Sequence, residues 1–269
     1  KRADQMRRDQ PEDNIRPRQK HYENLTERAS LLYSGHKFSV DFLYSYSHGR
    51  NYFLTDKKAL HTLSDGTIHP MNTNESQKSR FNRHNLRLGG DYLFADDHQL
   101  SLTYNAQFMN GFNLSTVNGT QTSNARTRMV DQLHNGQIDY HTPFGMKAGV
   151  EYTYYHSPSS QLLHSRLEGD ELNFRSSDSQ RINRWKLFLS QEHELPNGWG
   201  VNYGAVYTTS LDNSYQYYYN SENDNMMLES NNMKSRRREQ TLNFYAGFNK
   251  SFGDNLSLDA SLAAEQFHT

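Results

Sequence analysis

The sequence predicts an all-β protein of about ten antiparallel strands arranged as five hairpins. Apolar residues recur at every second position through these segments, which is the period of a strand with two unlike faces. Tight-turn signals alternate with long polar connections along the chain. No segment places its apolar residues at the 3.6-residue spacing of an amphipathic helix. These three observations together favour an up-and-down sheet.

The first two hairpins show the alternation most clearly. Residues 26–34 and 37–47 are joined by a turn at Ser34-Gly35, and residues 84–94 and 99–108 are joined at Asp96-Asp97. In 37–47 the apolar residues share one face of the expected strand, and they are Phe38, Val40, Phe42, Tyr44 and Tyr46. The polar residues Lys37, Ser39 and Asp41 take the opposite face, so each strand has one apolar and one polar side.

Three further hairpins repeat this pattern around the turn sequences TPFG, PNG and GD. Their expected strands are 135–141 with 146–156, 184–195 with 199–209, and 240–252 with 255–264. Long polar loops are expected between hairpins, roughly through 56–78, 109–124, 157–180 and 210–236. One end of the sheet should therefore carry tight turns and the other end long loops.

This asymmetry bears on what the apolar face contacts. Outer-membrane barrels have short periplasmic turns, long extracellular loops and an outward apolar band, whereas a small soluble barrel keeps its apolar side chains inside. No expected helix could cover these faces, so lipid is the better match. The predicted fold is a transmembrane antiparallel up-and-down β-barrel segment in the bacterial outer membrane.

The aromatic residues gather toward both ends of the expected strands, as the two interfacial girdles of a membrane barrel do. The residues expected to face lipid or to form the girdles are Phe38, Phe42, Tyr44, Tyr92, Phe94, Tyr152, Trp185, Trp199 and Phe248. Charges cost about 2–4 kcal/mol on the lipid side at the midplane, so the opposite register should face a wet lumen. The residues expected there are Asp41, Arg83, Arg87, Asp91, Asp139, Lys147, Glu151 and Glu192.

Composition narrows the function classes. The chain has 269 residues with a net charge of −1, which gives no support to a nucleic-acid partner. It has no cysteine, which excludes disulfides and zinc–thiolate sites. It contains no run of 18 apolar residues that would predict a transmembrane helix, and its first residues do not read as a signal peptide.

Residues that could carry chemistry do not form a recognisable motif. The histidines lack the spacing of a zinc site, and His84, His134 and His156 are expected at the rim of the apolar face. Acidic loop groups such as Glu222 and Asp224 lack a calcium-loop pattern. The basic run KSRRRE at 234–239 is expected to lie at the long-loop end of a strand and in the adjoining loop, with contact to an anionic glycolipid as the alternative. We therefore expect no catalytic centre, cofactor or metal site.

The hairpin rhythm, polar lumen register and loop style over about residues 23–268 resemble the barrels of TonB-dependent outer-membrane receptors. The resemblance implies a receptor that imports a nutrient across the outer membrane with energy from TonB. It also implies a plug domain and further barrel strands in the parent chain, with a surface lipoprotein as a candidate partner. No plug or TonB-contacting segment is visible in this sequence. The alternatives are a ten-stranded outer-membrane enzyme of the protease or lipase type and a soluble β-rich binding protein.

The strand directions predict an incomplete barrel. The first strand runs toward a short turn and the last strand runs away from one, so both ends should lie on the extracellular side, opposite to a complete barrel. Residues 1–22 are expected to be the remainder of an extracellular loop, and residues 23–269 a partial outer-membrane β-barrel. Strands outside this chain should then pair with both edges, because unpaired backbone groups are costly in lipid.

Overall fold

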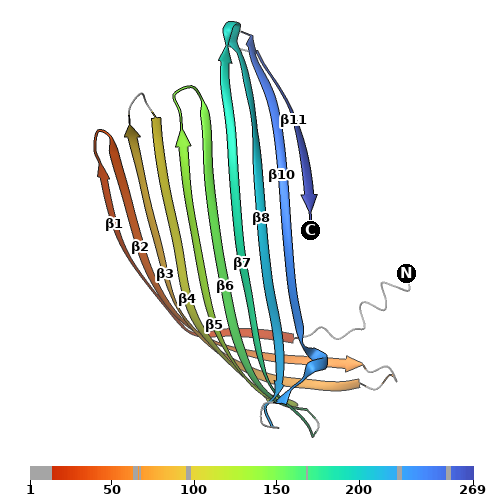
Figure 1. The fold of residues 1–269 in the computed structure, drawn as a ribbon. Coiled ribbons are helices and arrows are strands. Elements are labelled where there is room, and N and C mark those ends of the chain that lie inside the picture. Colours follow the sequence, from red (N-terminus) through yellow and green to blue (C-terminus); the bar gives the residue numbers. More distant parts are fainter. Residues whose placement is uncertain are drawn as a thin grey trace.

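The computed structural model describes residues 14–62, 66, 68–94, 98–167, 169–222, 226–252 and 256–269. These residues form one antiparallel sheet of eleven strands, which Figure 1 shows as a single curved layer with β1 and β11 at opposite edges. The long strands are β1 (Asn14–Ser34), β2 (Phe38–Thr62), β3 (Ile68–Phe94), β4 (His98–Gly119), β5 (Gln121–His141), β6 (Met146–Leu167), β7 (Asp170–Leu195), β8 (Trp199–Asn220), β10 (Met233–Phe252) and β11 (Leu256–His268).

The minor elements lie at the two ends of the sheet. The two-residue strand β9 (Met226–Met227) pairs with β8. Single 3-10 turns, η2 (Pro196–Gly198) and η3 (Glu229–Asn231), follow β7 and β9. The part of the chain that the structure describes contains no α-helix, and none of its helices is long and apolar enough to cross a membrane.

The predicted up-and-down order is confirmed. Each long strand pairs antiparallel with the next, in the order β1 to β8, then β10 and β11. The five predicted hairpins are all present. The turn residues 95–97 and 253–255, like residues 1–13, lie outside the described residues.

The strands extend much further than the sequence pattern indicates. Strands β2 and β3 are 25 and 27 residues long, whereas about 9–11 residues suffice to cross a bilayer. Most of the segments expected to be loops, such as 109–124 and 157–180, are the far halves of strands. Strand β1 likewise begins at Asn14, inside the segment expected to be a loop remainder. Both faces of these extensions are polar, so they lack the apolar alternation by which a strand is recognised.

Two of the tight turns depend on left-handed backbone conformations. Gly145 closes the β5–β6 turn with φ +87°, and a side chain there would meet the carbonyl oxygen of Glu192. Asn197 and Gly198 close the β7–β8 turn with φ of 65° and 71°. Glycine and asparagine tolerate this region best, which is why these residues act as turn signals.

The sheet has no packed core of its own. Ala59 and Ala106 are the only buried apolar residues among those described, and no second layer covers either face. Strand β1 pairs only with β2, and β11 only with β10, so the described sheet is not closed into a barrel.

Candidate functional site

The register separates two unlike faces across all the long strands. Phe42 on β2 pairs with Leu88 on β3, which pairs with Tyr104 on β4, so residues of the apolar alternation share one face. All the residues expected in the lipid or girdle set lie on this face, which we call the band face. Those expected in the lumen lie on the other, which we call the polar face. The register does not say which face contacts lipid, so that assignment stays a prediction.

An apolar band crosses the band face in the halves of the strands nearest the tight turns. On β6 it runs from Met146 to Tyr154 through Ala148, Val150 and Tyr152. Its large side chains stay open to the surroundings: Leu102 is 46% exposed and Leu187 is 48% exposed. A contiguous apolar surface of this kind marks contact with a membrane or a partner, because a monomer in water rarely keeps one exposed.

Aromatic rings line the band at the tight-turn end. The ring centroids of Phe94 and Tyr140 lie 6.1 Å apart, and His98 stacks on Tyr140 at 5.8 Å. Further along the same tight-turn end, the ring centroids of Trp199 and Phe248 lie 5.9 Å apart. These rings form a girdle that spans β3 to β10 near the turns.

A row of tyrosines marks the opposite end of the band. Each of these rings belongs to the band while its hydroxyl group forms a hydrogen bond with a polar side chain of the next strand. The pairs are Tyr44 with His84 at 2.8 Å, Tyr46 with Asn82 at 3.0 Å, Tyr104 with His134 at 2.7 Å, Tyr152 with Asn183 at 2.9 Å, and Tyr207 with Gln240 at 2.9 Å. Rings with one apolar and one wet end suit a membrane–water boundary. We call this row the tyrosine rim.

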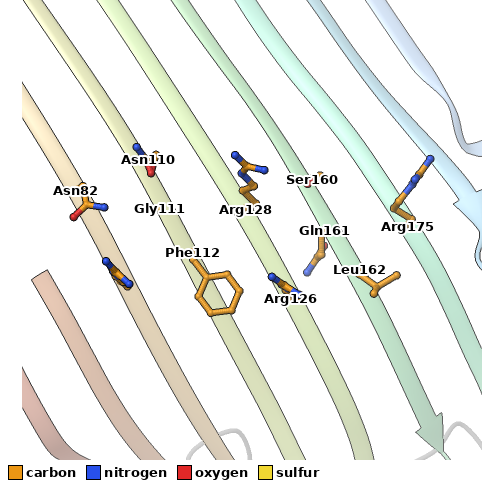
Figure 2. Close-up of a pocket in the computed structure, with 11 residues that line it drawn as sticks. Asn82, Asn110, Gly111, Phe112, Arg126, Arg128, Ser160, Gln161, Leu162 and Arg175 are labelled. Atoms are coloured by element: carbon orange, nitrogen blue, oxygen red, sulfur yellow. The ribbon is translucent and has the colours of Figure 1, made fainter. Parts of the chain in front are cut away.

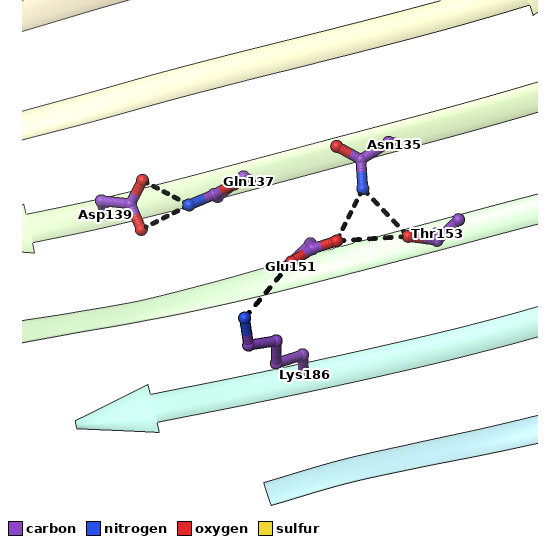
Figure 3. A network of polar contacts seen from close by, with 6 residues as sticks. All are labelled: Asn135, Gln137, Asp139, Glu151, Thr153 and Lys186. Carbon is purple, nitrogen blue, oxygen red and sulfur yellow. Dashed lines mark hydrogen bonds and ion pairs between the residues drawn. The ribbon is translucent and has the colours of Figure 1, made fainter. Parts of the chain in front are cut away.

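On the polar face, several of the charges level with the band have an ion-pair or hydrogen-bond partner. Arg87 Nε lies 3.2 Å from Asp41 Oδ2, and the Ser101 hydroxyl donates to Asp91 at 2.6 Å. Figure 3 shows a second group, in which Asn135 Nδ2 donates to Glu151 at 2.9 Å and Lys186 Nζ lies 4.0 Å from the same carboxylate.

The remaining residues expected in the lumen lie on the same face. The Gln137 amide donates to both oxygens of Asp139 at 3.0 and 2.8 Å (Figure 3). Arg83 contacts Met109 Sδ at 3.4 Å. Lys147 pairs in register with Ser190, and Glu192 with Asn202.

Beyond the tyrosine rim, the band face becomes strongly basic. Its cations on β2 to β10 are Arg50, Lys58, Lys78, Arg80, Arg126, Arg128, Arg166, Arg175, Arg181, Lys234, Arg236 and Arg238. On the same stretch of the face, from β1 to β10, the described strand carboxylates are Glu23, Asp56 and Glu171, which pair with Arg50, Arg18 and Arg166. The polar face at the same level carries both signs, including Glu75, Asp131, Asp178, Arg83 and Arg184.

The centre of this basic stretch is hollowed. A cavity of ≈ 520 Å³ is lined by Arg80, Asn82, Asn110, Gly111, Phe112, Arg126, Arg128, Ser160, Gln161, Leu162 and Arg175 (Figure 2). We call it the arginine hollow. No carboxylate lines it, and within the described chain none of its four arginines has an ion-pair partner.

Sequence reasoning missed the arginine hollow. Its arginines fall in or beside segments that were expected to be loops, and a loop gives no expectation about which residues share a face. The signal was present in Arg126-Thr127-Arg128, whose two-residue spacing puts both cations on one face of a strand. His84 and His134, expected at the rim, lie in the tyrosine rim. Among the described residues no group of three His, Asp or Glu side chains could hold a metal ion.

Comparisons with known proteins find likeness only among solved structures. No protein-family model matches the chain, and no curated protein matches it. The ferric yersiniabactin uptake receptor FyuA from Yersinia pestis aligns over 94% of this chain and 54% of its own length, with 7% identity and a TM-score of 0.44.

Two other structures align less well. The ferric citrate transporter FecA aligns over 88% of this chain and 43% of its own length, with 10% identity and a TM-score of 0.38. The β domain of the Bordetella autotransporter BrkA aligns over 95% of this chain and 92% of its own length, with 12% identity and a TM-score of 0.23. The chain thus spans about half the length of the two receptors it is aligned with first. TM-scores this low carry no argument about function.

Proposed function

We propose that this chain is a section of a β-barrel in the bacterial outer membrane. The observation that carries the proposal is the apolar band, which is exposed on one face of ten long strands and bordered by aromatic rings at both ends. Outer-membrane barrels have such a band, about 25 Å tall between two aromatic girdles. The paired charges of the polar face then line a wet interior or contact a plug, as in the Asp41–Arg87 pair.

The open edges support the same proposal. Backbone groups without partners cost several kcal/mol each in lipid, so an open sheet cannot be the final state in a membrane. Edge strands β1 and β11 have free sides among the described residues. In this proposal, further strands of the parent protein pair with both edges and close the barrel.

The finer part of the proposal is that the parent is a TonB-dependent receptor that imports a nutrient. It rests on the resemblance of the hairpin rhythm and lumen register to that family. The very long strands agree with it, because their far halves would rise well above the membrane and frame an extracellular binding site. The plug domain, TonB and a surface lipoprotein are the partners that the resemblance implies.

Two strains test the receptor proposal, one without the full-length protein and one without TonB function. Import of a nutrient should be lost in both strains, and expression of the full-length protein should restore it only where TonB is functional. Uptake that depends on the protein but not on TonB would contradict the receptor assignment. Recovery of the protein from the soluble fraction without detergent would contradict the membrane assignment itself.

The enzyme alternative has a separate test. Purified full-length protein should not hydrolyse peptide or phospholipid substrates. Activity that disappears with alanine at a histidine of the tyrosine rim, such as His84 or His134, would favour an outer-membrane enzyme instead.

A further inference from the structure

We propose that the arginine hollow binds the phosphate groups of a glycolipid headgroup in the outer leaflet of the membrane. The inference rests on the proposed function, because it needs the band face to contact lipid. It goes further by naming a ligand class and a site on the protein's outer surface, apart from any nutrient site inside the barrel.

The register sets the spacing of the cations. Arg80 pairs with Phe112, which pairs with Arg128, so the two arginines lie two strands apart with an aromatic ring between them. Arg126 and Arg175 are likewise separated by Leu162. At a strand spacing of about 4.8 Å, each of these arginine pairs is about 10 Å apart at the backbone. The four guanidinium groups therefore surround the hollow instead of crowding one point, which leaves room for more than one phosphate.

Two of the four guanidinium groups lie over aromatic rings, and none of the four is paired with a carboxylate among the described residues. Arg126 lies over the ring of Phe112 at 5.1 Å from its centroid, and Arg175 lies over the ring of Tyr219 at 4.8 Å. A guanidinium group over a ring is attracted by the π face and forms no ion pair there, so its N–H donors stay available to an anion. Those donors match two phosphate oxygens at once, which is the geometry of bidentate phosphate recognition.

The site is short of negative charge. Arg50 and Arg80 face each other directly across β2 and β3, an arrangement that is destabilising between like charges unless an anion lies nearby. Glu23 is 3.8 Å from Arg50, and Arg80 has no such partner among the described residues. An anionic ligand in the arginine hollow would relieve this repulsion.

The position of the hollow selects a lipid as the source of the phosphate. It lies on the same face as the apolar band and beyond the tyrosine rim, so acyl chains on the band would have their headgroup at this level. On β4, Phe112 is four residues beyond Phe108, or about 13 Å along the strand. Phe112 and Leu162 add an apolar floor that free phosphate does not need but a glycolipid can use.

The test uses the full-length protein in nanodiscs of zwitterionic phospholipid. The probes are bisphosphorylated lipid A, the same lipid after enzymatic removal of its phosphates, and inorganic phosphate. The variant is R126Q/R128Q, and the control is R83Q/R184Q, which removes the same charge from the polar face. Binding is measured by native mass spectrometry and by fluorescence titration.

The phosphorylated lipid should bind the unaltered protein and the control alike. The R126Q/R128Q variant should bind it about a hundredfold more weakly, because two charge-assisted hydrogen-bond partners are lost. Equal binding of the phosphorylated and dephosphorylated lipids would overturn the proposal, as would an equal loss in the control variant. If inorganic phosphate binds as tightly as the phosphorylated lipid, the claim that the ligand is a lipid is overturned.

Membrane insertion is followed in the same samples by fractionation. If the protein is not recovered in the membrane, the proposed function fails. If the protein is inserted but shows no preference for the phosphorylated lipid, only the glycolipid site fails.

Discussion

Replacing Ile138 with arginine places a charge on the band face where the account expects lipid. Ile138 pairs with Leu102 on one side and Val150 on the other, and it is 45% exposed. Gln137, the preceding residue, lies on the polar face and pairs with Thr103 and Glu151. The variants I138R and Q137R therefore add the same side chain to the same strand, at almost the same level, on opposite faces.

The structure sets the depth of the substitution. The band on β6 runs from Met146 to Tyr154, so Val150 lies four residues from each end. Four residues are about 13 Å along a strand and about 10 Å along the membrane normal at the usual barrel tilt. Ile138 lies opposite Val150, near the midplane, where an arginine facing lipid costs about 2–4 kcal/mol. Q137R should cost less than about 1 kcal/mol, because the added cation faces water beside Asp139 and Glu151.

The assay is urea unfolding of the full-length protein in phospholipid vesicles, followed by the mobility difference between the folded and unfolded forms on a gel. The free energy of unfolding should fall by about 2–4 kcal/mol for I138R and by less than about 1 kcal/mol for Q137R. An equal, small effect of both variants would refute the reasoning, since it would mean that Ile138 faces water. A larger effect of Q137R than of I138R would reverse the assignment of the two faces.

Two further predictions concern a tight turn and the tyrosine rim. Gly145→Ala should destabilise the protein by about 1–3 kcal/mol, because alanine is strained at a positive φ and its Cβ would meet the Glu192 carbonyl oxygen. The control is Gly66→Ala, which shares the positive φ but has open space around it, and it should destabilise the protein less. Thermal unfolding measures both variants, and equal effects would contradict the role of the Glu192 contact. Tyr152→Phe should lower the free energy of unfolding by about 0.5–1.5 kcal/mol, because it removes the hydrogen bond to Asn183. Tyr155→Phe, on the polar face, should leave the free energy of unfolding almost unchanged. Equal urea midpoints for the two variants would contradict a stabilising role for the tyrosine rim.

The sequence was informative where one face of a strand is apolar. Alternation from Phe38 to Tyr46 and from Leu100 to Phe108 was enough to predict strands, their faces and their pairing into hairpins. It was uninformative where both faces are polar. The far half of β2, from about His48 to Thr62, has no apolar period, and only pairing with β1 and β3 identifies it as strand.

The candidate site was predictable to a similar extent. The separation of Asp41 and Arg87 from Phe42 and Leu88 follows from the two-residue period alone. The tyrosine rim and the arginine hollow do not, because both depend on which residues of neighbouring strands lie opposite each other. Register of that kind is fixed by the tertiary structure, and in the polar halves of the strands no apolar pattern specifies it from sequence.

The central claim is that the band face contacts lipid, and spin labels along β4 test it most directly. This sequence contains no cysteine, so single cysteines from Gln99 to Asn110 give one label each in the full-length protein once any cysteine elsewhere in it is replaced by serine. The labels are measured in bilayers. Accessibility to oxygen, which dissolves in lipid, should peak at the even positions from Leu100 to Phe108, and accessibility to a water-soluble nickel complex at the odd positions between them. Oxygen accessibility that peaks at the odd positions, or that does not alternate, would contradict the account.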